Sequence, residues 1–392
     1  MHPKRKLMRP YHALPAILSL ILSSQVAGQT AAYAITDKNT ALSPAVEAAL
    51  KDKLQALFST VCSKDEFSGV YVVARGNHVI SEAACGEASK RYHVANTMDT
   101  IFNVASVGKM FTAVAIGQLA DAGRLSYADP VSKYVDASWL SPEVAKKITI
   151  GQLLSHTSGL GNIFTNKFIN GPYMQMAAMR NLADYKPFTR DATLEFAPGS
   201  NYLYSNMGMF FLGVIIEKVS GQDYFDYVRQ HVFLATGMNS TDNYIRDEGT
   251  ENLATGYIST RGATASKKEN TVLIPVRGGP YGIGYSNAPD LLRFADALQT
   301  GKLLKPATRQ LFWQDQTAGR ADKGSYGYGF ELRSGKLGKI VGHSGQFPGI
   351  SSNLDMYLDA GYTVVVLSNY EPGVLPLAGR IAAVLENAVG LE

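Results

Sequence analysis

The alternation of hydrophobic and polar residues near the start of the chain predicts one helix followed by a β-hairpin. Apolar side chains recur at helical spacing over residues 44–58, which begin with a proline, a residue favoured in the first turn of a helix. Residues 69–74 form an apolar run, and Gly76-Asn77 separates it from a second run at 78–80. Two such runs around a short glycine-containing turn are typical of a hairpin.

The rest of the chain is first mostly helical and then returns to strands. Helical patterns occupy residues 106–120, 150–154, 208–219, 225–233 and 289–298, and strand patterns occupy 326–332, 340–342, 351–357 and 362–368 before a last helix at 377–388. Strands at both ends with helices between them predict an α+β fold. We expect an antiparallel sheet flanked by N- and C-terminal helices, from about 35–95 and 311–392, with an all-helical domain inserted over about 96–310.

The composition is that of a folded globular protein. Hydrophobic residues make up 46% of the 392 residues and charged residues 18%, which excludes the disordered, highly charged classes. The formal net charge is +4, which by itself favours an acidic partner such as nucleic acid or a membrane surface.

The positive charge is concentrated at the N-terminus, which changes this interpretation. Four Lys and Arg residues between Lys4 and Arg9 precede an apolar run at 13–22 and the small-residue sequence Ala32-Tyr33-Ala34. This order predicts a signal peptide over residues 1–34, because the apolar run is far shorter than the roughly 20 residues of a membrane anchor. The remaining chain has 33 of the 37 Lys and Arg residues against 33 Asp and Glu. We therefore expect a periplasmic or secreted protein without a nucleic-acid partner or a stable membrane anchor.

Two cysteines, Cys62 and Cys85, flank the predicted hairpin. In an oxidising compartment the hairpin can bring them together as a disulfide. Two buried free thiols are the alternative, since the hairpin register is not readable from the sequence. Neither cysteine has neighbours that would activate a thiolate, so a catalytic cysteine is not expected.

The sequence lacks the common motifs of cofactor and metal sites. It has no phosphate-binding G-x-x-x-x-G-K-[ST], no dinucleotide-binding G-x-G-x-x-G, no H-E-x-x-H and no G-x-S-x-G. We expect neither a cofactor nor a metal, and an α/β-hydrolase is disfavoured. A small molecule or short peptide is the expected partner, as substrate.

One remaining pair has the spacing of a nucleophile and its base. Ser106 and Lys109 are one turn apart at the start of a predicted helix, so the lysine amine can approach the serine hydroxyl. A helix N-terminus also favours a developing oxyanion. Lys109 can accept a proton only if burial or another cation lowers its pKa. An exposed serine and lysine without a function is the alternative for an isolated S-x-x-K.

Two further motifs supply groups for acyl transfer. Tyr204 could exchange a proton near Lys109, and Asn206 could both donate to and accept from the nucleophile region and a substrate carbonyl. His343-Ser344-Gly345 lies on a predicted edge strand, where the glycine would let a substrate approach. The N–H of Gln346 could then be a second oxyanion donor.

In this order and spacing, the motifs at 106–109, 204–206 and 343–345 resemble those of the class C β-lactamase-like serine hydrolases. This family includes D-Ala-D-Ala carboxypeptidases, D-aminopeptidases and β-lactamase-fold esterases. Further stretches at 153–160 and 365–369 are similar too, so the resemblance covers nearly all of residues 44–390. It implies an α/β sandwich with a helical domain and the active site between them, in agreement with the pattern above.

The resemblance also implies a role for each motif residue. Ser106 would be the acylated nucleophile, Lys109 and Tyr204 the proton-transfer pair, and Asn206 a positioner of the substrate. The main-chain N–H groups of Ser106 and Gln346 would form the oxyanion hole. The family-like His156 is expected to be structural rather than catalytic.

The sequence departs from the β-lactamase pattern at His343, where a lysine would help to bind a substrate carboxylate. A neutral histidine supplies a donor without a full charge. This favours an ester or lactone hydrolase, ahead of a D-amino-acid peptidase such as a D-Ala-D-Ala carboxypeptidase, and then a β-lactamase. A non-catalytic envelope binding protein is the alternative outside enzymes, and the completeness of the three motifs disfavours it.

Residues 161–195 are rich in aromatic and methionine side chains. They could wall an acyl or leaving-group pocket, and plain packing in the helical domain is the favoured interpretation. The side chains concerned are Phe164, Phe168, Tyr173, Met174, Met176, Met179, Tyr185 and Phe188.

Overall fold

The computed structural model describes residues 42–165, 168, 174–259, 266–318, 320, 325–371 and 373–389. The chain divides into two compact units, Met1–Lys38 and Asn39–Glu392, and everything reported below belongs to the second. The expected signal peptide, residues 1–34, lies outside the described residues.

The second unit is built around a seven-stranded sheet of order β2-β1-β13-β12-β11-β10-β9, in which all neighbours are antiparallel. Its strands are β1 (Gly69–Arg75), β2 (His78–Cys85), β9 (Ser325–Tyr326), β10 (Glu331–Gly335), β11 (Gly338–Phe347), β12 (Ile350–Tyr357) and β13 (Tyr362–Ser368). The first and last long strands pair along their whole length, from Gly69 opposite Ser368 to Arg75 opposite Tyr362. The expected sheet built from the two ends of the chain is thus confirmed.

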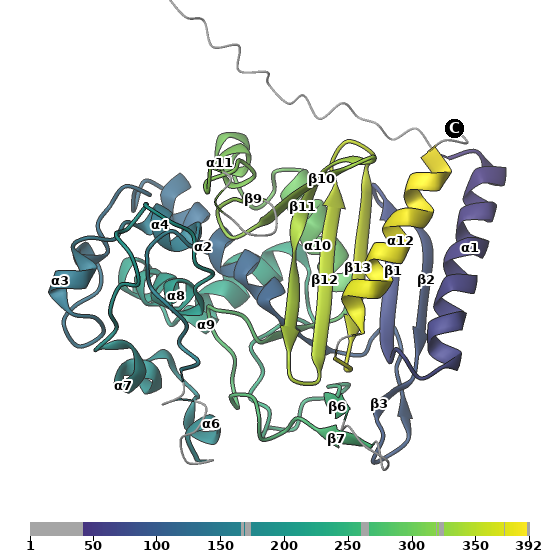
Figure 1. Ribbon diagram of the computed structural model, residues 1–392, viewed down its shortest axis with the longest axis horizontal. Coiled ribbons are helices and arrows are strands. Elements are labelled where there is room, and N and C mark those ends of the chain that lie inside the picture. Colours follow the sequence, from purple (N-terminus) through teal and green to yellow (C-terminus); the bar gives the residue numbers. More distant parts are fainter. Residues whose placement is uncertain are drawn as a thin grey trace, which may run out of the picture. The chain divides into compact units, whose positions relative to one another are not determined.

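Both faces of the sheet are buried, which explains why its central strands are continuously apolar. On β1, Tyr71 and Val73 belong to the cluster with α1 (Pro44–Ser63) and α12 (Val374–Val389). Val70 and Val72, on the opposite face, join the larger core that the remaining helices build. Figure 1 shows α1 and α12 side by side against one face of the sheet.

Residues 96–310 supply most of the helices on the other side of the sheet. The described α-helices are α2 (Lys109–Asp121), α3 (Pro142–Ala145), α4 (Ile150–Leu154), α6 (Met174–Ala178), α7 (Lys186–Thr189), α8 (Asn206–Ser220), α9 (Tyr224–Val228), α10 (Ala288–Gln299) and, across the end of this stretch, α11 (Pro306–Phe312). Short 3₁₀ turns form η1 (Ser106–Gly108), η2 (Val131–Lys133) and η3 (Leu182–Tyr185), and a π-helix, η4 (Arg229–Leu234), continues α9. The antiparallel sheet with an inserted helical part confirms the predicted fold class.

Short strands also occur in this inserted part. The pairs are β3 (Glu87–Ser89) with β4 (Val94–Ala95), β5 (Phe102–Ala105) with β8 (Gly284–Ser286), and β6 (Tyr257–Ser259) with β7 (Lys267–Glu269). Helix α10 packs against β13 and β1, so one helix of the inserted stretch covers the sheet itself.

One expected strand, 326–332, is in fact two. Gly327 and Phe330 form a turn between β9 and β10, in which the Gly327 N–H donates to the Phe330 carbonyl over 2.9 Å. Gly329 has φ +80°, and a Cβ atom there would lie 2.4 Å from the Ala113 Cβ. The chain turns because it passes too close to α2 for any residue with a side chain.

The structure resolves the alternative left open for the cysteines. Cys62, near the end of α1, and Cys85, the last residue of β2, form a disulfide with Cα atoms 6.1 Å apart. The bond ties the first helix to the edge strand of the sheet.

Candidate active site

The candidate nucleophile, Ser106, begins the short turn η1 that leads from β5 into α2. The residue before it, Ala105, has φ +42°, a strained conformation for an alanine. Its N–H donates to Asn103 Oδ1 over 2.9 Å, and its carbonyl accepts the Ile283 N–H over 3.0 Å. A Cβ atom at Gly282 would lie 2.4 Å from the Ala105 carbonyl oxygen. These contacts hold the serine in a fixed, strained turn.

The side chain of Lys109 is completely buried one turn after Ser106. Its Nζ lies 2.9 Å from Ser106 Oγ, 2.7 Å from Asn206 Oδ1 and 2.5 Å from the Tyr281 carbonyl oxygen. Burial lowers the pKa of Lys109 well below its ordinary value, although the Glu331 carboxylate acts in the opposite direction. When the amine is neutral, its two N–H groups donate to the two oxygens that can only accept, Asn206 Oδ1 and the Tyr281 carbonyl oxygen. The lone pair then faces the serine hydroxyl.

Tyr204 lies close to both the nucleophile and Lys109. Its hydroxyl interacts with the Ser106 hydroxyl, and Lys109 Nζ lies 4.8 Å from the centre of its ring. Burial raises the pKa of Tyr204 above its ordinary value, and the Ser106 contact opposes this only in part. Tyr204 is therefore a neutral phenol at neutral pH and can donate a proton.

Asn206 links the nucleophile to a loop of the helical part. Its Oδ1 accepts from Lys109, and its Nδ2 donates to Asn162 Oδ1 over 3.0 Å. The preceding Ser205 caps helix α8, because its hydroxyl accepts the Gly208 N–H over 2.8 Å. The cap fixes the start of α8 and so the positions of Tyr204 before it and Asn206 at its first residue.

His156 holds the loop that carries Tyr204. Its carbonyl accepts the Leu203 N–H over 2.9 Å, and its Nδ1 accepts the Ser205 N–H over 3.1 Å. Its ring centre lies 4.4 Å from that of Tyr204, and burial lowers its pKa well below the ordinary value. His156 bonds the residues on both sides of Tyr204 and is a neutral positioning residue, which agrees with the structural role expected for it.

Strand β11 brings its end against the nucleophile turn. A Cβ atom at Gly345 would lie 2.5 Å from the Val104 oxygen and 2.9 Å from the Ser106 nitrogen. The strand pairs with β10 only as far as Gly342, so its last residues form an edge. A two-residue turn follows Phe347, and the alternation of the ladder therefore points the main-chain groups of Gln346 away from β12. The expected second oxyanion donor lies on this free edge.

The side chain of His343 is committed within the protein. Its Nδ1 donates to the Ser344 carbonyl over 2.6 Å, and its Nε2 then accepts the Tyr326 hydroxyl over 2.9 Å. Burial lowers its pKa, against the opposing effect of Glu331, and the ring is 1% exposed. The expected hydrogen bond from His343 to a substrate would need one of these two bonds to break.

The described aromatic and methionine side chains of 161–195 pack in or against the large core. Phe168, Met179 and Tyr185 are buried in the large core. Phe164 is only partly buried, and its ring centre lies 5.2 Å from that of Tyr281 and 5.3 Å from that of Phe347. Phe164 therefore contacts both Tyr281, whose carbonyl accepts from Lys109, and Phe347 at the end of β11. Met176 and Phe188 are partly buried against the core, and Tyr173 and the Met174 side chain lie outside what the structure describes.

Several functional groups escaped the sequence reasoning. They are the carbonyl of Tyr281, the amide of Asn162, the hydroxyl of Tyr326 and the carboxylate of Glu331. The glycine pair at 278–279 is the one sequence feature that marks the loop that carries Tyr281. In the described part of the chain, no cluster of three or more His, Cys, Asp or Glu is suited to a metal ion. No described helix has the length and hydrophobicity of a membrane span.

Comparison with known proteins points to the family that the three motifs resemble. Residues 47–388 match the Beta-lactamase family. Penicillin-binding protein 4* of Bacillus subtilis (strain 168) is 31% identical over 84% of this chain and 75% of its own length. Esterase EstB of Burkholderia gladioli is 30% identical over 45% of this chain and 47% of its own. The crystal structure of a penicillin-binding protein from Bacillus halodurans aligns with a TM-score of 0.76 at 30% identity, over 83% of this chain and 98% of that one.

The family match spans most of the chain, and a relative above 30% identity is aligned over most of its length. Both findings confirm the resemblance that the three motifs carry. The chain belongs to the Beta-lactamase family of serine hydrolases.

Proposed function

We propose that this protein is an exported serine hydrolase that forms an acyl-enzyme on Ser106 and acts on an ester, lactone, amide or D-amino-acid peptide, with esters favoured. The observation that carries the proposal is the environment of Lys109. A buried amine with two acceptor-only partners and a serine hydroxyl at 2.9 Å is poised to accept the serine proton.

In the acylation step, Ser106 Oγ bonds to the substrate carbonyl carbon while its proton passes to Lys109. The carbonyl electron pair moves to oxygen, and the N–H groups of Ser106 and Gln346 stabilise the oxyanion. When the tetrahedral intermediate collapses, Tyr204 gives its proton to the leaving group and regains one from Lys109. The low pKa of Lys109 and the raised pKa of Tyr204 support this division of roles.

Deacylation uses the same groups in the same sense. Water attacks the ester carbonyl and loses a proton to the Lys109 and Tyr204 pair. The second oxyanion collapses with release of Ser106 Oγ, which takes the proton back. The product is a carboxylic acid, and the enzyme returns to its starting state.

The surroundings of His343 support an ester as the preferred substrate. A neutral, buried imidazole with both nitrogens bonded offers no positive charge to a substrate carboxylate at this position. The carboxylate-bearing substrates of a carboxypeptidase or a β-lactamase lose that anchor here. The partly buried Phe164 beside Phe347 supports an apolar acyl group of limited length.

Export is proposed on two observations. The first is the leader-like order of basic, apolar and small residues over 1–34. The second is the Cys62–Cys85 disulfide, a bond that persists in oxidising compartments. Sequencing the N-terminus of the protein recovered from the periplasm or medium tests this, and an uncleaved chain retained in the cytoplasm would contradict it.

The substrate class is tested by three parallel assays. Purified protein is given p-nitrophenyl esters of rising chain length, a D-Ala-D-Ala peptide and a chromogenic cephalosporin, with the Ser106→Ala variant as background. We expect the highest kcat/KM on short esters, and we expect Phe164→Ala to move the optimum to longer chains. Faster turnover of the peptide or the cephalosporin would reject the ester preference. Absence of turnover on all three would favour the binding protein.

A further inference from the structure

A cavity lies outside the candidate active site, and none of the catalytic or substrate-binding candidates named above lines it. Its volume is about 550 Å³, which is within the range of pockets that hold small molecules. Its walls come from β5 and β8, from the segments 246–256 and 270–276, and from the turn between β11 and β12.

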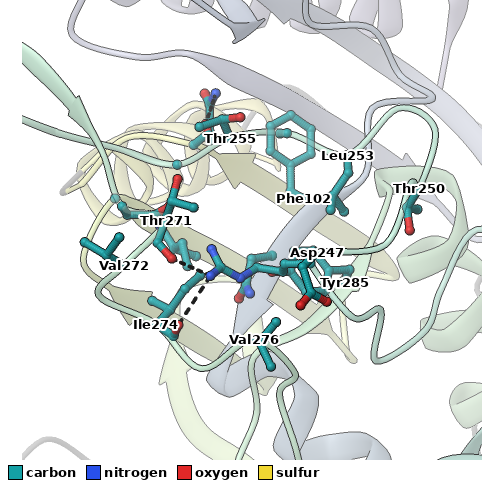
Figure 2. Close-up of a pocket in the computed structure, with 18 of the residues that line it drawn as sticks. Phe102, Asp247, Thr250, Leu253, Thr255, Thr271, Val272, Ile274, Val276 and Tyr285 are labelled. Carbon is teal, nitrogen blue, oxygen red and sulfur yellow. Dashed lines mark hydrogen bonds between the residues drawn. The ribbon is translucent and has the colours of Figure 1, made fainter. Parts of the chain in front are cut away.

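Apolar side chains form much of the wall. Figure 2 shows Phe102 and Leu253 on one side of the cavity, and Ile274 and Val276 on the other. Such walls suit the apolar body of a small organic molecule.

Arg246 brings a positive charge to this cavity, and the hydrogen-bonding capacity of its guanidinium is only partly used. Its guanidinium donates to the carbonyls of Thr271, at 2.5 Å, and Ile274, at 3.4 Å, and both bonds are drawn in Figure 2. Its Nε is buried without a hydrogen-bond partner, and no carboxylate in the described part of the chain forms an ion pair with it. Burial lowers the pKa of Arg246, against the opposing effects of Tyr285 and Asp247. An anion in the cavity would supply the missing partner.

Other buried polar groups of the wall also lack partners. The Tyr285 hydroxyl lies near the Asn103 side chain without a hydrogen bond of normal geometry, and Asn369 Oδ1 has no partner either. Tyr285 is 2% exposed and Asn369 3%. Because buried polar groups are nearly always bonded, their gathering on one cavity indicates that a polar molecule completes them.

The charges at the cavity's edge limit the kind of anion. Asp247 and Glu248 also line the cavity, and Asp247 is already paired with Arg180. A singly charged carboxylate that bonds Arg246 would be repelled by both of these groups. A phosphate dianion would meet twice that repulsion.

Three residues of the cavity wall also contact Ala105, the residue before the nucleophile. Asn103, one of its wall residues, accepts the N–H of the strained Ala105 that precedes Ser106. Ile274 and Ile350 line the cavity and also form a small apolar cluster with Ala105. A molecule in the cavity therefore touches the residues that hold the nucleophile turn.

We propose that this cavity is an effector site, which binds a small carboxylate with an apolar body and thereby alters turnover at Ser106. The binding part stands on the cavity alone, whereas the effect on turnover rests on the proposed function.

Benzoate is the probe, and benzamide is its uncharged counterpart. Isothermal titration gives the dissociation constants for the wild type and for Arg246→Gln, with Arg190→Gln as a matched control at an exposed arginine outside the cavity. We expect saturable benzoate binding that weakens at least tenfold in Arg246→Gln and changes less than twofold in Arg190→Gln. Val276→Phe, which adds volume to the cavity wall and keeps the arginine side chain, should also weaken binding if Arg246→Gln folds poorly.

Each result decides one part of the inference. No saturable binding of benzoate, equal binding of benzamide, or equal affinity in Arg246→Gln would overturn the site. Tighter binding of inorganic phosphate at the same arginine would overturn the carboxylate. Saturating benzoate should change kcat in the wild type and leave it unchanged in Arg246→Gln. If the wild type binds benzoate and its kcat does not change, the coupling is overturned. If the wild type has no hydrolytic activity, the proposed function is contradicted instead.

Discussion

His156 lets the positioning of the catalytic tyrosine be tested separately from its chemistry. The residue has φ +59°, so its backbone is left-handed, and its Nδ1 accepts the Ser205 N–H beside Tyr204. Three substitutions separate these two features. Asn tolerates the left-handed backbone and places Oδ1 where Nδ1 stood. Gly keeps only the backbone, and Ala keeps neither.

The magnitude follows from the hydrogen bond that is lost. Leaving the buried Ser205 N–H unpaired costs about 1–3 kcal/mol, and a left-handed alanine costs roughly 1–2 kcal/mol more than glycine. If the loop relaxes to pair that N–H with water, Tyr204 moves, and each 1.4 kcal/mol lost in the transition state is about tenfold in rate. We expect His156→Ala and His156→Gly to lower kcat by about 10- to 100-fold, with KM little changed. His156→Asn should stay within about fivefold of the wild type.

The assay is steady-state ester hydrolysis with urea unfolding of each variant. Stability should fall in the order Asn, Gly, Ala, since only the alanine variant loses both features. The acidic limb of the pH profile should not move in His156→Asn, because the buried histidine is already neutral. Equal kcat in the Asn and Ala variants, or an acidic limb that disappears with His156, would refute the positioning role.

Three further predictions concern the base, the strand and the disulfide. Burial lowers the pKa of Lys109, and the base must be unprotonated, so kcat/KM should fall as the pH drops through that pKa. In Lys109→Arg, whose guanidinium cannot deprotonate, kcat should fall by at least about 100-fold at every pH. Near-normal turnover of this variant would reject Lys109 as the base. Gly345→Ala should lower kcat strongly, since its Cβ would lie 2.3 Å from Ser352 Oγ, while Gly379→Ala, with nothing within 4 Å, should leave kcat unchanged; equal kinetics would contradict the close approach. Replacing both cysteines with serine should lower the free energy of unfolding by about 3 kcal/mol for a separation of 23 residues, measured in urea, and no change would show that the bond constrains little.

Local patterns predicted much of the fold because local chemistry determines it. The hairpin of β1 and β2 and the proline at the start of α1 follow from residues near in sequence. The pairing of the terminal strands follows instead from the placement of strand patterns at both ends of the chain. The disulfide did not follow. A register shift between Val73 and Ala74 sets where Cys85 falls, and no side-chain pattern announces that bulge.

Part of the candidate site could be predicted from the sequence, and part could not. Ser106 and Lys109 are one helical turn apart, so their contact is readable from spacing. The other partners of Lys109 are an amide 97 residues away and a main-chain carbonyl 172 residues away. A main-chain carbonyl has no residue type to recognise, and its position depends on how the inserted helices pack. The commitment of His343 to Tyr326 was not expected either, because it depends on the placement of β9 and β11 on the two sides of β10.

The central claim is an acyl-enzyme on Ser106, and mass spectrometry of the trapped protein tests it most directly. The wild type is treated with a fluorophosphonate or a fluorescent penicillin, and the adduct is located by tandem sequencing. The account predicts one adduct per chain, on Ser106, which disappears in Ser106→Ala and slows in Lys109→Ala. An adduct on another residue, or equal labelling of Ser106→Ala, would contradict it.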